Sequence, residues 1–141
     1  MVRSFCWVNE FDNALNSYND CNILAKEQNN IVHEVKSSHK LAEFKIESLQ
    51  YSDALSLINC GVEKPEDINI VDLSGDIYYF RSIVNYHLGK LDEALEDINK
   101  CVNIRSLLKR HAKLNEGYIQ KGKILVRQCE YSESKKVLDK I

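Results

Sequence analysis

The feature that most constrains the fold of this chain is a short pattern that recurs every 40 residues. Each copy holds a large apolar residue, then Asp or Ser, then a polar or acidic residue, and then a small residue. The small residues are Ala14, Ala54, Ala94 and Ser134, and no gap is needed to align the four copies. Self-similarity at a fixed period is typical of repeat proteins, in which each repeat is one supersecondary unit.

The columns of this pattern indicate helices. Asp and Ser accept hydrogen bonds from the free N–H groups at a helix start, and an acidic residue suits the positive end of the helix dipole. Four residues beyond the small residue, on the same helical face, the copies hold Tyr18, Ile58, Ile98 and Leu138. A second small residue precedes the last three copies, again 40 residues apart: Ala42, Ser82 and Gly122. We therefore predict two helices per period, packed as a hairpin that crosses at the small residues.

A single hairpin cannot bury its apolar face, so the hairpins are expected to stack into a solenoid. The predicted first helices cover residues 31–48, 68–88 and 110–128, and the second helices cover 10–28, 51–62, 91–107 and 131–141. We predict one repeat array over residues 1–141, with repeats at about 1–28, 31–62, 68–107 and 110–141. The first repeat is truncated, because only residues 1–9 are left for its opening helix.

The pattern resembles the tetratricopeptide (TPR) family, whose motif has a small residue in the first helix, an aromatic residue at the turn, and Ala, an aromatic residue and Ala along the second helix. The best copy runs from Tyr78-Tyr79-Phe80-Arg81 through Leu88-Gly89-Lys90-Leu91-Asp92-Glu93-Ala94-Leu95 to Ile98 and Cys101. The resemblance covers nearly all of the chain and implies an all-α fold, a right-handed α-α superhelix of TPR-like hairpins.

Three features depart from the family. Its usual period is about 34 residues, so each repeat here carries six more, which we interpret as longer helices. The proline that commonly ends the second helix is absent. Only Gly89 supplies the usual turn glycine, and its equivalents are Asn9, Leu49 and Cys129.

The resemblance implies that the first helices line a concave groove that takes an extended peptide or a helix of a partner. Tyr79 and Tyr86 are candidate anchors because tyrosine offers rigid contact area with a polar tip, but packing of these rings on the neighbouring helix is an equal alternative. Carrying over the groove positions of the motif gives Lys36, His39, Glu43, Ile46, Asp76, Tyr79, Ile83, Tyr86, His87, Glu116, Ile119, Lys123, Val126 and Arg127.

Chaperone-binding TPR modules clamp a terminal carboxylate with Lys and Asn at fixed groove positions, since such a group needs several charge-assisted donors. The matching positions hold His39, Glu43, Asp76, Phe80 and Gln120. This clamp is missing, so a chaperone carboxyl terminus is not the first partner that the sequence suggests.

No sequence pattern predicts catalysis, a cofactor or a metal. The four histidines have no metal-ligand spacing with each other or with cysteine. Cys21 and Cys101 occupy a small-residue column and are interpreted as packing residues. Gly117 and Gly122 lie inside a helical pattern, so they form no phosphate-binding loop. We therefore expect a protein that is not an enzyme and takes no small-molecule substrate.

The charge pattern disfavours nucleic acid as a partner, because the net charge is −2 and the pI is about 6.1. A basic stretch of Arg105, Lys109, Arg110 and Lys113 around one inter-repeat turn is interpreted as a solvated surface, with docking of an acidic protein segment as the alternative. No apolar run is long enough to cross a membrane, and residues 1–7 lack a secretory signal. The five scattered cysteines suit reduced thiols in the cytoplasm.

These observations predict a non-catalytic scaffold or adaptor, co-chaperone-like in kind, that binds a partner peptide or helix. The alternative is a peptide-sensing regulatory segment that relays a signal to an attached output domain. Solenoids need polar caps, and the terminal repeats here are incomplete. We therefore expect either a longer chain or ends that a partner or a second copy covers.

Overall fold

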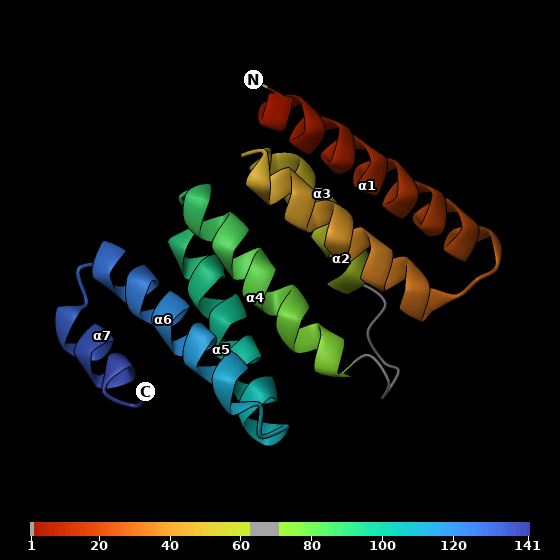
Figure 1. Ribbon diagram of the computed structural model, residues 1–141. Coiled ribbons are helices and arrows are strands. Elements are labelled where there is room, and N and C mark those ends of the chain that lie inside the picture. The colour runs from red at the N-terminus through yellow and green to blue at the C-terminus, as the bar shows by residue number, and fades with distance from the viewer. Residues whose placement is uncertain (1, 63–70) are drawn as a thin grey trace. The chain divides into compact units, whose positions relative to one another are not determined.

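The computed structural model describes residues 2–62 and 71–141, and these residues form seven helices (Figure 1). The described part of the chain contains no strand, so the predicted all-α class is confirmed. The helices are α1 (Val2–Glu27), α2 (Ile31–Glu47), α3 (Tyr51–Val62), α4 (Val71–His87), α5 (Leu91–Leu107), α6 (His111–Arg127) and α7 (Tyr131–Leu138).

From α4 to α7, each helix of 17 residues is followed by a turn of three residues, so that two helices and two turns fill the 40-residue period. Four helices, α2, α4, α5 and α6, have this length. The six residues in excess of the TPR period therefore lengthen the helices, as predicted, and leave the turns short.

The turns after α1, α2, α4, α5 and α6 are Schellman motifs. In the turn after α4, the Lys90 N–H donates to the Asn85 carbonyl at 2.8 Å and the Gly89 N–H donates to the Tyr86 carbonyl at 3.2 Å. The residue at the centre of each turn has positive φ, and these residues are Asn29, Leu49, Gly89, Lys109 and Cys129. They lie at intervals of 20 or 40 residues, so the turn geometry repeats even where glycine does not.

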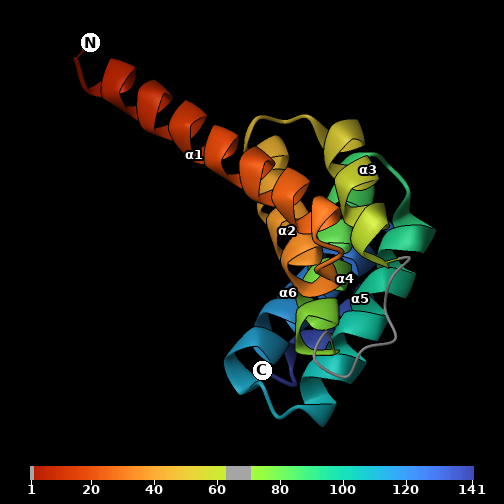
Figure 2. The same ribbon diagram turned by 90° about the vertical axis from the view of Figure 1, so that its right-hand side faces the viewer.

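The first helix differs from the prediction. The sequence predicts an opening helix that ends near Asn9 and a second helix from residue 10, whereas α1 is one continuous helix of 26 residues. Figure 2 shows it as a single straight rod. An isolated helix of nine residues is marginal in water, because nucleation is costly. Continuing the helix through Asn9 satisfies the backbone hydrogen bonds that a turn there would leave to water.

The chain divides into two compact units, Met1–Lys64 and Pro65–Ile141. In the first, α2 packs against both α1 and α3; in the second, α5 packs against α4 and α6, α7 packs against α6, and α4 touches α6. Each unit is thus built from antiparallel helix pairs. One continuous array over residues 1–141 stays a prediction.

The hairpins cross at the small residues that the period identified. Six of the seven are buried, namely Ala42, Ala54, Ser82, Ala94, Gly122 and Ser134, and Ala14 is half-buried. Small residues at a crossing let the two helix backbones approach closely. In the second unit, Ala94, Ile98, Cys101 and Ile124 form one core cluster, each fully buried. No helix in the described residues is both long enough and apolar enough to span a membrane.

Candidate partner-binding surface

The predicted groove residues divide between the two units. Lys36, His39, Glu43 and Ile46 lie on α2, where Lys36 is exposed and His39 is only 8% exposed. The His39 Nε2 lies 3.4 Å from the Glu43 Oε1. These two predicted groove residues therefore contact each other along their own helix.

The other ten predicted residues lie on α4 and α6, which are neighbours in the second unit. On α4 the side chains of Asp76, Tyr79, Ile83 and Tyr86 are half-buried, and His87 is exposed. All five on α6 are exposed: Glu116, Ile119, Lys123, Val126 and Arg127. Apart from His87, the exposed side chains of this predicted surface therefore belong to α6.

Both candidate tyrosine anchors pack within the protein, as the alternative interpretation allowed. The Arg105 guanidinium lies 4.7 Å from the Tyr79 ring centroid, and the Arg127 guanidinium lies 4.7 Å from that of Tyr86. Arg127 Nη1 also donates to the Tyr86 carbonyl at 2.9 Å. Both rings contact the core cluster of the unit. Truncating them would therefore weaken the fold itself, and they make poor probes of binding alone.

The environment of Tyr79 also affects its ionisation. Burial raises the pKa of the phenol, the charge of Glu116 raises it further, and Arg105 opposes both. The phenol is therefore neutral at physiological pH and can donate a hydrogen bond.

Arg105 is the residue that the sequence interpretation places wrongly. It was expected on a solvated basic surface, yet it is only 3% exposed. Its Nη2 lies 3.1 Å from the Asp76 Oδ1, and its Nη1 donates to the Lys113 carbonyl at 2.6 Å. Lys113 Nζ lies 3.3 Å from the Asp76 Oδ2 as well. The Asp76 carboxylate therefore forms ion pairs within the unit, with Arg105 and Lys113.

Two helical glycines lie close to α5 near this arginine. A Cβ on Gly75 would lie 3.3 Å from the Ile104 Cγ2, and one on Gly117 would lie 3.1 Å from the Val102 Cγ2, which are tight approaches. The distances to Arg105 itself, 3.5 Å to its Cγ and 4.0 Å to its Nη1, are ordinary van der Waals contacts. Glycine inside an otherwise regular helix was the sequence signal for a close approach between helices, and it can be interpreted only when α4, α5 and α6 are known to pack together.

The cysteines have two different environments. Cys101 is fully buried, as expected for the small-residue column, and burial raises the pKa of its thiol to about 11. A thiol that stays protonated is a poor nucleophile. Cys21 was also expected to pack but is exposed. No cluster of three or more metal-ligating side chains occurs in the described residues.

Comparison with known proteins supports the fold and leaves the family open. No protein-family model matches the sequence, and no curated protein matches it. The structure is similar to the crystal structure of BtubC (BKLC) from P. vanneervenii, with a TM-score of 0.83 and 14% identity over 94% of this chain and 55% of that chain. The chain thus spans about half the length of that protein. At this identity the likeness shows the fold alone.

Two crystal structures of MamA are also similar over most of their length. They share 16% and 15% identity with this chain, cover 94% and 98% of it and 86% and 84% of their own chains, and both have a TM-score of 0.49.

Proposed function

We propose that this chain is a non-catalytic protein-interaction module that binds a helix or extended segment of a partner protein along α6. One observation carries the proposal: Ile119 and Val126 are 44% and 46% exposed, seven residues apart and therefore on one face of the helix. In helix-in-groove recognition the apolar face of a partner helix packs against an exposed apolar surface, and these two aligned residues offer such a surface.

The charges around this strip suggest the chemistry of the partner. Lys123 lies between the two aliphatic residues and is exposed, whereas Arg127 is engaged by Tyr86. A segment with two apolar anchors and an intervening carboxylate would complement the strip. The TPR resemblance, which assigns these same α6 positions to the groove, supports the choice of this face.

The test uses substitutions that leave the core intact. Peptides selected by the full chain from a random display library are synthesised and titrated against the wild type and against Ile119→Ser/Val126→Ser. We expect apolar and acidic residues in the selected peptides and a loss of affinity of about tenfold or more in the variant.

Leu107→Ser is the matched control, because it removes an exposed leucine from another part of the unit. Equal affinity of the wild type and the α6 variant would place the site elsewhere, and failure to select any peptide would count against the module. We also propose a cytoplasmic location, because Cys21, Cys101 and Cys129 are free thiols.

A further inference from the structure

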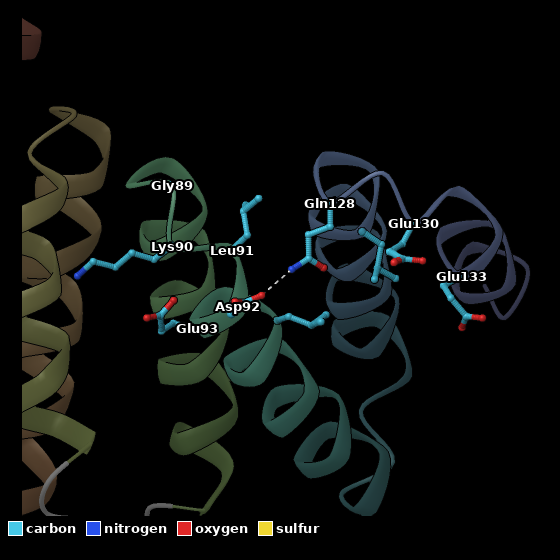
Figure 3. Close-up of a pocket in the computed structure, with 10 residues that line it drawn as sticks. Gly89, Lys90, Leu91, Asp92, Glu93, Gln128, Glu130 and Glu133 are labelled. Atoms are coloured by element: carbon cyan, nitrogen blue, oxygen red, sulfur yellow. Dashed lines mark hydrogen bonds between the residues drawn. The ribbon is translucent and has the colours of Figure 1, made fainter.

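An open hollow lies between the α4–α5 turn and the α6–α7 turn (Figure 3). Its volume is about 770 Å³. Three leucines supply its apolar lining, namely Leu91, Leu95 and Leu125. Around them stand four carboxylates, Asp92, Glu93, Glu130 and Glu133, and Lys90 is the one basic residue among the ten lining residues that the structure describes.

The carboxylates are only partly neutralised. Asp92 accepts a hydrogen bond from the Gln128 Nε2 at 3.1 Å, and Glu133 pairs with Lys136 at 3.1 Å. Glu93 and Glu130 are exposed and take part in none of the ion pairs between the described residues. The hollow therefore suits an aliphatic side chain that is followed by a positive charge.

The α5–α6 turn of the same unit has that chemistry. Leu107 is 83% exposed and Leu108 is 38% exposed. Lys109 follows them, is exposed and occupies the positive-φ position of the turn. Leu107 is the most exposed of the large apolar residues that the structure describes.

The turn and the hollow of one copy cannot meet. Leu91 of the hollow begins α5 and Leu107 ends it, so the two sites lie at opposite ends of a 17-residue helix (Figure 1). That length is about 25 Å. We propose that a second copy of this chain docks its Leu107–Lys109 turn in the acidic hollow, with Leu107 against the leucines and Lys109 beside Glu93 and Glu130.

This contact is heterologous, since different patches of the two copies meet, and repetition of it would add copies head to tail. It buries a small area, so we expect weak association. Its ionic part is surface-exposed and is screened by salt. The net charge of −2 produces little long-range repulsion between copies.

Sedimentation equilibrium of the full chain tests the proposal. We expect the average mass of the wild type to rise with concentration, and to rise less in high salt. Lys109→Glu, Leu107→Ser and the hollow variant Glu93→Lys/Glu130→Lys should each weaken self-association by about tenfold or more. Ile119→Ser/Val126→Ser is the matched control and should associate like the wild type, which separates this contact from the proposed partner site.

The decisive experiment mixes Lys109→Glu with the hollow variant. Lys109→Glu alone has an acidic turn and an acidic hollow, and the hollow variant alone has a basic turn and a basic hollow. When the two variants are mixed, the turn of each variant can dock in the oppositely charged hollow of the other. Association should therefore return in the mixture. A wild type that stays monomeric at all concentrations overturns the proposal. So does self-association that these variants leave unchanged, or a mixture that stays monomeric while circular dichroism shows both variants folded.

Discussion

The hairpins α4–α5 and α6–α7 cross in the same way but with their side chains exchanged. In α4–α5 the Ser82 Oγ on the first helix donates to the Ala94 carbonyl on the second, at 2.9 Å. In α6–α7 the Ser134 Oγ on the second helix donates to the Gly122 carbonyl on the first, at 3.0 Å. The repeat thus requires a close approach at this crossing, and either helix can supply the hydroxyl.

A larger difference lies beside the crossing. In α4–α5, Asp97 is 2% exposed and accepts from Arg81 Nε at 2.9 Å, Arg81 Nη2 at 2.6 Å and Asn85 Nδ2 at 3.0 Å. Burial lowers the pKa of Arg81, but the hydrogen bond and charge of Asp97 outweigh it, so the pKa is raised. Forty residues later these three positions hold Lys121, Leu125 and Val137, of which the last two are buried. At these positions one hairpin has a buried ion pair, and the other has two buried apolar residues and a half-buried lysine.

The largest expected effect comes from breaking the ion pair on one side. Asp97→Val leaves the Arg81 guanidinium without its carboxylate, and we expect a loss of about 3–5 kcal/mol in the free energy of unfolding. The triple variant Arg81→Lys/Asn85→Leu/Asp97→Val copies the α6–α7 set, and it should recover most of that loss, since apolar residues often replace a buried pair without cost. Urea denaturation measures both. A triple variant as unstable as the single would show that the two hairpins are not interchangeable.

The next effect depends on pH. Cys101 in α4–α5 and Ile141 after α7 occupy equivalent positions, 40 residues apart. Ile141 is 55% exposed, whereas Cys101 is fully buried. Its pKa rises from 9.0 to about 11 because of burial, so the native state holds its proton more tightly than the unfolded state. The resulting stability is complete below pH 9 and is lost as pH rises toward 11.

Thermal unfolding between these pH values measures that loss. Tyr79, whose pKa is also raised, adds to the decline in the same direction. Cys101→Ala should show a shallower decline with pH than the wild type. Identical slopes would mean that the thiol does not ionise differently in the two states.

The hydroxyls at the crossings should have a smaller and equal effect. Ser82→Ala and Ser134→Ala each remove one buried hydrogen bond, which contributes about 1 kcal/mol. Because the two crossings lie in different hairpins, the double variant should lose the sum. Ser56→Ala, which removes the bond from an exposed Ser56 Oγ to the Ser52 carbonyl, is the control and should be near neutral. A large difference between the first two would mean that one crossing depends on its hydroxyl and the other does not.

The smallest effects concern the turns. Gly89 and Cys129 occupy the same position in the two hairpins, with φ of 79° and 62°. Gly89→Ala meets no atom within 4 Å, so its expected cost of about 1 kcal/mol is backbone strain. Cys129→Gly relieves such strain, but it also raises the conformational entropy of the unfolded chain. We therefore expect the free energy of unfolding to rise by only about 0.5 kcal/mol. Melting temperatures that move in the same direction for both variants would contradict a shared turn geometry.

The interface between successive helix pairs shows how far the period predicts contacts. Asn22 on α1 donates to the Ser37 Oγ on α2 at 2.9 Å. The residues 80 positions later are Val102 and Gly117, where a Cβ on the glycine would lie 3.1 Å from the valine. The same two columns meet in both units, once through a hydrogen bond and once through van der Waals contact. Asn22 and Ser37 differ in chemistry from Val102 and Gly117, so the period predicts where the two helices touch but not the kind of contact that they make.

Outside α1, which the pattern predicted as two helices, the sequence by itself determined the described helices, their pairing in hairpins, their turns at fixed intervals and the small residues at the crossings. These features follow from local hydrogen bonding and from a period that the repeats share. Only the tertiary structure decided that Arg105 is buried beside Asp76, that Tyr79 and Tyr86 pack inward, and that Leu107 is exposed. Those outcomes depend on which side chains from three helices compete for the same space. They are specific to one repeat, and a repeating pattern contains no information about what differs between its copies.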